Sequence, residues 1–189
     1  MSLALGKKDI CMIWESHYWK RDLLKISKKL NNRQNQKKWF ETSLAKVEQD
    51  IMLGFYTIRK LKEAKKLSDS IANERVLLEA FPATGKPVTY MNWHKLDELY
   101  DLSKPNGQSR HLGFICDQII HSYVFMANFD EQSKFSGILF CSDKKRNVEL
   151  YSLSLNKISN LFEKIGNDYP SRIEMVFNEK NQDFDISNR

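Results

Sequence analysis

The chain has 189 residues, of which 41% are hydrophobic and 29% are charged, close to the average usage of globular proteins. This length suits one substantial domain, or a domain with an appended helical arm. No apolar run approaches the roughly eighteen residues that a membrane-spanning helix needs, so we expect a soluble protein without a membrane partner. The start of the chain, MSLALGKKDICMIW, lacks the sustained apolar core and the cleavage site of a secretory signal.

Positive charge is concentrated near the N-terminus. The net charge is +6, but residues 1–70 hold 16 Lys and Arg against 8 Asp and Glu, whereas residues 71–189 hold 14 against 16. A basic third beside a near-neutral remainder suggests an anionic partner such as nucleic acid. A solvated lysine-rich surface explains the same counts, and we favour that explanation. Lysines outnumber arginines 22 to 8, so base-specific reading is not expected.

The cysteines indicate the redox environment. Cys11, Cys116 and Cys141 lie far apart, and no two of them form a CxxC pair. This spacing excludes a dense disulfide framework and is typical of proteins in a reducing compartment. We therefore expect a cytoplasmic protein.

Two amphipathic helices are predicted before residue 62. Within residues 12–30, apolar side chains recur at every third or fourth position, and the polar sequence NNRQNQ follows. Residues 40–61 carry a longer stripe of the same spacing, formed by Phe40, Leu44, Val47, Ile51, Phe55, Ile58 and Leu61. Met52 and Tyr56 lie off this stripe, so we expect the second helix to pack on two sides. Gly54 suggests a close helix crossing, because glycine is unfavourable in a helix interior without such a reason.

Short strands are predicted after residue 74, in RVLLEAF, PVTYM, VFMANF, SGILFCS, NVELYSLSL, RIEMVF and DFDIS. Further helices are predicted near residues 92–100, 110–126 and 155–166. In RIEMVF, the alternation of Ile173, Met175 and Phe177 predicts an inward face, and DFDIS can pair with this strand across NEKN.

Helices first and strand pairs later predict an α+β fold. We expect an N-terminal antiparallel helical hairpin, followed by a mixed domain with an antiparallel sheet and two or three helices. The division falls between residues 1–70, a basic helical hairpin, and residues 71–189, an α+β domain. The two parts form either separate domains or a single compact unit.

The stretch CDQIIHSYVF, residues 116–125, resembles a reactive site more than any other. If residues 110–126 form one helix, Arg110, Asp117 and His121 lie on one polar stripe, where a cation, an acid and an imidazole could cleave a phosphate ester. The same pattern is typical of an ordinary half-buried helix, in which Asp117 and His121 form a modest surface pair. We favour the second interpretation.

Other reactive motifs are absent from the sequence. The segment ATGKP (83–87) has neither the first glycine nor the Ser or Thr of a phosphate-binding loop. The histidines show no HxxxH or HExxH spacing, and no GxSxG or GxGxxG pattern occurs. We therefore expect no cofactor and no metal site.

Basic residues gather around the tip of the predicted helical hairpin: Arg21, Lys25, Lys28, Lys29, Arg33, Lys37 and Lys38. Such a patch can neutralise phosphates without reading sequence. Three hypotheses follow. The first is a non-enzymatic module that binds an unidentified protein partner or forms a homo-oligomer. The second is a sequence-tolerant nucleic-acid binder that uses these seven residues. The third is a phosphodiester hydrolase that uses Arg110, Asp117 and His121.

Overall fold

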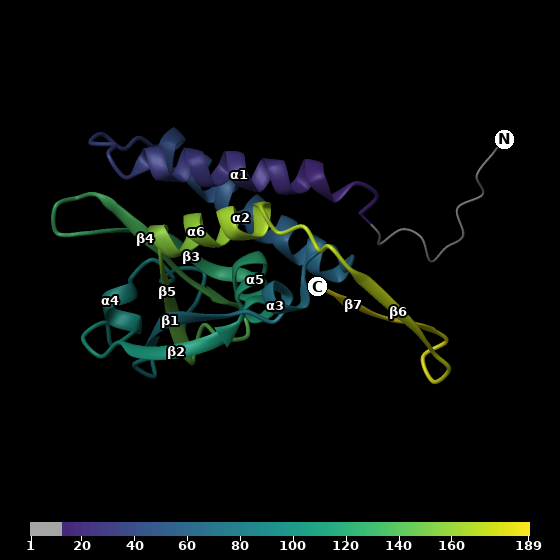
Figure 1. The fold of residues 1–189 in the computed structure, drawn as a ribbon. Helices are drawn as coiled ribbons and strands as arrows, with labels where there is room; N and C mark the ends of the chain where they lie inside the picture. Colours follow the sequence, from purple (N-terminus) through teal and green to yellow (C-terminus); the bar gives the residue numbers. More distant parts are fainter. Residues whose placement is uncertain (1–12) are drawn as a thin grey trace, which may run out of the picture.

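The computed structural model describes residues 13–189 and shows an α+β fold (Figure 1). Its helices are α1 (Ser16–Arg33), α2 (Glu41–Glu63), α3 (Asp69–Ala72), α4 (Leu96–Leu99), α5 (Leu112–Ile120) and α6 (Leu155–Gly166). Its strands are β1 (Arg75–Pro82), β2 (Asn106–His111), β3 (Ser122–Phe129), β4 (Phe135–Ser142), β5 (Glu149–Ser154), β6 (Ile173–Asn178) and β7 (Asp183–Asn188). The expectations for the start of the chain and for Cys11 concern residues outside the described range.

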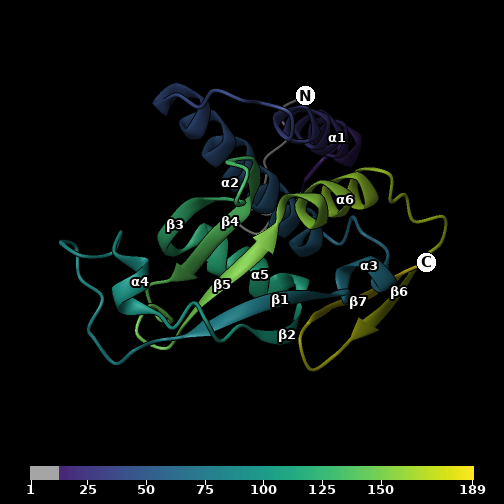
Figure 2. The same ribbon diagram turned by 90° about the vertical axis from the view of Figure 1, so that its left-hand side faces the viewer.

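Five strands form an antiparallel sheet in the order β2-β1-β5-β4-β3, which confirms the predicted fold class. Ala80, Tyr151 and Phe140 are neighbours across three of these strands, and all three are buried. The helices α5 and α6 pack on the sheet, and α1 and α2 lie beyond them (Figures 1 and 2). The other face receives Tyr100, whose hydroxyl lies 3.4 Å from the Sγ atom of Cys141.

Several predicted elements differ from the structure. The predicted strand PVTYM is a loop, because Asn92 accepts hydrogen bonds from the backbone and the hydroxyl of Thr89 and closes a turn there. Strand β2 was not predicted, since its sequence NGQSRH has no apolar residue to mark it. The predicted helix over residues 110–126 is only α5, preceded directly by β2 and followed by β3. Apolar residues of α5 and β3 thus imitated one long helical stripe, and polar residues of β2 extended its polar side.

The N-terminal helices run antiparallel, and α1 contacts both α2 and α6 (Figure 1). Ser27 of α1 donates a hydrogen bond to the carbonyl of Ser159 in α6, over 2.9 Å. A Cβ atom on Gly54 of α2 would collide with the ring of Phe162 from α6, so the glycine makes room for this ring rather than for a close crossing of the two helices. The predicted second packing side of α2 is present only in part, because Met52 packs against the core whereas Tyr56 is exposed.

Two buried polar side chains join the linkers at one end of the molecule. The Lys20 ammonium of α1 donates hydrogen bonds to the carbonyls of Lys66, over 2.8 Å, and of Asp168. Asn188, at the end of β7, donates from Nδ2 to the carbonyls of Lys65 and Leu67, over 2.8 and 2.9 Å. Both side chains therefore hold the loop between α2 and α3 against parts of the chain more than a hundred residues away.

None of the helices in residues 13–189 combines the length and the apolar composition that crossing a bilayer requires.

Candidate functional site

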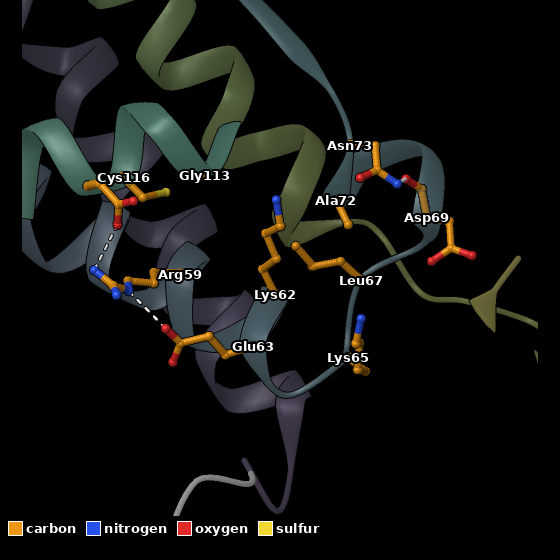
Figure 3. Close-up of a pocket in the computed structure, with 11 residues that line it drawn as sticks. Arg59, Lys62, Glu63, Lys65, Leu67, Asp69, Ala72, Asn73, Gly113 and Cys116 are labelled. Carbon is orange, nitrogen blue, oxygen red and sulfur yellow. Dashed lines mark hydrogen bonds and ion pairs between the residues drawn. The ribbon is translucent and has the colours of Figure 1, made fainter. Parts of the chain in front are cut away.

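Arg59, near the C-terminal end of α2, lies at the centre of a polar cluster between α2 and α5 (Figure 3). Its Nε donates to Oε1 of Glu63 over 2.8 Å, and its Nη1 lies 2.8 Å from Oδ1 of Asp117. The same Nη1 is 3.4 Å from Nε2 of His121. The hydrogen bond to Glu63 raises the pKa of Arg59, and hydrogen bonds from Lys60 and Arg59 lower the pKa of the Glu63 carboxyl. This guanidinium is therefore permanently charged and held in orientation by two carboxylates.

Arg59 and Asp117 line two clefts. The first has a volume of about 380 Å³, and Lys62, Lys65 and Asp69 line it together with Arg59 (Figure 3). The second has a volume of about 580 Å³ and lies between α5 and the turn from β4 to β5. Phe114, His121 and Lys144 are among its lining residues. Both volumes fall in the range of small-ligand sites.

The structure places the predicted Arg110, Asp117 and His121 differently from a single helical stripe. Asp117 lies in α5 and His121 caps its C-terminal end, but Arg110 belongs to β2, where it pairs with Val76. The one-helix prediction is therefore wrong. Asp117 and His121 do meet an arginine, but it is Arg59 of α2, whose contact with them no local pattern in the sequence reveals.

Arg110 joins a different network, centred on Glu149 of β5. The Glu149 carboxylate accepts hydrogen bonds from Nε2 of Gln108, over 2.8 Å, and from the hydroxyl of Tyr151. Nη2 of Arg110 lies 3.6 Å from it, and Nζ of Lys145 lies 3.4 Å away. Burial would raise the pKa of Glu149, but its hydrogen bonds from Tyr151, Gln108 and Lys145 leave that pKa below the usual value. This network connects β2 to β5 across β1. No pattern in the sequence predicted that these side chains would meet.

The predicted basic residues lie on α1 and on the loop that follows it, and their charges are partly offset. Nζ of Lys25 lies 2.8 Å from Asp22, and Nζ of Lys29 lies 3.1 Å from Asp50. The remaining predicted basic residues have no carboxylate partner among residues 13–189: Arg21, Lys28, Arg33, Lys37 and Lys38. The surface is therefore basic, but less so than the count of lysines suggested.

Strands β6 and β7 form a two-stranded hairpin that projects from the body of the molecule, called here the C-terminal arm (Figure 1). The pairs Met175/Ile186 and Phe177/Phe184 place apolar side chains on one face together with Ile173. The other face carries Val176 among polar and acidic residues: Glu174, Asn178, Asp183, Asp185 and Ser187. The arm is therefore an amphipathic ribbon.

The apolar face of the C-terminal arm is open to solvent. Ile173, Met175, Phe177 and Phe184 are between 51% and 59% exposed. The predicted alternation and strand pairing are confirmed, but the predicted inward orientation is wrong, because no other described element covers this face. An isolated two-stranded hairpin is only marginally stable in water. An apolar face that no other element covers is a further unfavourable exposure of apolar surface to water.

Within the described residues, no three His, Cys, Asp or Glu side chains gather in a way that could hold a metal ion. Comparison of the chain with protein-family models, curated proteins and solved structures gives no significant match. The geometry of the arm and of the clefts therefore carries the functional argument alone.

Proposed function

We propose that the protein is a non-enzymatic self-association module whose C-terminal arm packs against the same arm of a second copy. The observation that carries this proposal is the row of half-exposed apolar side chains on one face of the arm. Burying apolar surface is the main driving force for association, and a face of this kind in a folded protein marks an interaction site.

Charge indicates that two copies would meet through the apolar faces of their arms rather than through the acidic faces. Glu174, Asp183 and Asp185 make the opposite face of the arm acidic, so two arms that met there would repel each other. Two arms that meet through their apolar faces keep these carboxylates on the outside of the pair. An identical apolar patch on each copy is self-complementary about a twofold axis, which is the commonest symmetry of homo-oligomers.

The size of the apolar face limits the strength of the pair. Two half-exposed phenylalanines with an isoleucine and a methionine of similar exposure offer on the order of 400 Å² per copy. Face-to-face packing of two arms would bury on the order of 800 Å² in total, below the 1,200 Å² or more of stable interfaces. We therefore expect a reversible dimer with a dissociation constant of about 1–100 μM.

Measurement of mass against protein concentration tests this proposal. Wild-type protein is expected to pass from monomer to dimer over the micromolar range. Phe177→Lys places a charge on the apolar face and should keep the protein monomeric. The matched control is Val176→Lys, the adjacent residue on the opposite face, where the new charge lies across from Asp185. A monomeric wild type at about 500 μM, or equal loss of the dimer in both variants, would refute the proposal.

We also propose a cytoplasmic location for the protein. Cys116 and Cys141 are both buried free thiols, and burial raises the pKa of Cys116 to about 12. Thiols of this kind are unreactive, which agrees with a structural role in a reducing compartment.

A further inference from the structure

We infer that the 580 Å³ cleft between α5 and the β4–β5 turn binds a small phosphate monoester, such as a sugar phosphate or a mononucleotide. This site is independent of the C-terminal arm. Its polar walls come from three elements distant in sequence: Arg59 of α2, His121 at the end of α5, and Lys144 in the turn.

Charged hydrogen-bond donors remain available in this cleft, although carboxylates also line it. The two carboxylates that line it already have arginine partners, since Asp117 lies 2.8 Å from Arg59 and Asp143 lies 3.1 Å from Arg146. Lys144, by contrast, has no acceptor among the described residues, and Nη2 of Arg59 likewise has none. A ligand that complements the cleft must therefore bring acceptor oxygens and negative charge.

The position of Arg59 is fixed before a ligand arrives. Glu63 binds its Nε and Asp117 binds its Nη1, both over 2.8 Å, so the planar guanidinium is held at the edge of the cleft. A preorganised arginine loses less conformational entropy on binding phosphate than a free one does. The same carboxylates reduce the net positive charge, so we expect modest affinity with a dissociation constant of about 0.1–1 mM.

The cleft is too large for phosphate alone and includes an apolar wall. Phe114, half-buried on α5, lines it, and the Arg110 guanidinium and the Tyr151 ring hold Phe114 in place at 5.1 and 5.5 Å from its centre. A sugar or a base attached to the phosphate can lie against this ring. The ligand class is therefore a phosphate ester with an organic group, rather than inorganic phosphate.

Titration of the full chain with AMP, ribose 5-phosphate, adenosine and inorganic phosphate, followed by NMR chemical shifts or calorimetry, tests this inference. Both phosphate esters are expected to bind, and adenosine is expected to bind at least about tenfold more weakly, equivalent to about 1.4 kcal/mol. Stronger binding of AMP than of ribose 5-phosphate would identify a nucleotide, and equal binding would identify a sugar phosphate. Either result supports the site.

Variants locate the binding. Lys144→Ala should weaken phosphate-ester binding at least about fivefold, and Arg59→Gln at least about tenfold. Lys134→Ala is the matched control, because Lys134 is also an exposed lysine in a turn between neighbouring strands of the same sheet. The inference is overturned if neither ester binds at about 5 mM, if inorganic phosphate binds as well as the esters, or if Lys144→Ala and Lys134→Ala have the same effect.

Discussion

At the residue scale, Lys20 is the one charged side chain that is buried among residues 13–189. It is only 1% exposed, and its ammonium donates to two backbone carbonyls rather than to a carboxylate. Burial lowers the pKa of this amine, which reflects the free-energy cost of keeping a charge out of water. The carbonyls belong to residues just beyond the ends of α2 and α6, where helix dipoles favour a cation, and the ring of Tyr169 lies 4.5 Å away.

Replacing Lys20 with Met should therefore destabilise the fold, although methionine is the more apolar residue of similar size. The change leaves two carbonyls without their donor, and we expect the free energy of unfolding to fall by about 2–4 kcal/mol. Denaturant unfolding measures it. Lys25→Met, on the exposed side of the same helix, is the control and should change stability by less than about 0.5 kcal/mol. Equal effects of the two substitutions would show that the buried hydrogen bonds contribute nothing.

The lowered pKa of Glu149 makes the free energy of unfolding depend on pH. Its folded-state pKa lies below the ordinary value of 4.5, despite the opposing effect of burial, because Tyr151, Gln108 and Lys145 bind the ionised form. The stabilisation is therefore present above about pH 4.5 and is lost as the pH falls through the folded-state pKa. Glu149→Gln should lower stability at pH 7 by about 1–3 kcal/mol and flatten the decline below pH 4.5. Glu131→Gln, at an exposed position, is the control and should change stability at pH 7 by less than about 0.5 kcal/mol.

Asp117 and His121 illustrate a weaker surface contact. The Asp117 side chain is 55% exposed and its partner Arg59 is 35% exposed, so solvent screens their attraction. Asp117→Ala and His121→Ala, made separately, should each change stability by less than about 1 kcal/mol. Thermal unfolding of both variants measures this. A loss of more than about 2 kcal/mol in either one would mean that the cluster at Arg59 supports the fold rather than only lining two clefts.

At the element scale, the packing of α6 on α2 through Phe162 depends on Gly54. In an exposed helix, Gly→Ala gains up to about 1 kcal/mol of helix propensity. At residue 54 the added methyl group would collide with the Phe162 ring, which is itself fully buried, so the ring must shift within the packed core. We expect Gly54→Ala to destabilise by about 1–3 kcal/mol, and Phe162→Leu to reduce that cost in the double variant. In Gly113→Ala the new methyl group meets only the flexible end of Lys62, so this control should be neutral or stabilising.

The elements that could be predicted from the sequence are those with their own periodicity. The stripes of α2 and α6 and the alternation of β6 each lie within a single segment, and these elements formed where expected. Polar β2 carried no periodicity and was missed, whereas β2, α5 and β3 together imitated a longer helix. The contact of Arg59 with Asp117 joins residues 58 positions apart, so only the folded chain reveals it. The exposure of the C-terminal arm could not be predicted either. Alternation along a strand shows that an apolar face exists, but not whether another part of the folded chain covers it.

At the scale of the whole molecule, the basic surface of α1 can be judged from its charges. Two of its lysines already have the carboxylates of Asp22 and Asp50 as partners, and the charges of the rest spread over α1 and the following loop. Such a surface offers a nucleic acid about two to four phosphate contacts. The logarithm of the binding constant falls with the logarithm of the salt concentration by roughly 0.7 to 0.9 per phosphate contact. The affinity should therefore fall about ten- to a hundredfold between 50 and 200 mM salt.

We therefore expect mixed-sequence RNA and duplex DNA to bind weakly at 50 mM salt and not measurably at 200 mM. Changing Lys25, Lys28 and Lys29 together to Glu should abolish the binding at low salt for both nucleic acids alike, because these residues can contact phosphates but not read bases. Folding should survive, since all three side chains are exposed, whereas Leu23 and Leu30 of the same helix are buried. Fluorescence anisotropy of wild type and triple variant across this salt range provides the measurement. Tight binding that persists at 200 mM salt and disappears in the triple variant would make nucleic-acid binding, rather than self-association, the main function of the protein.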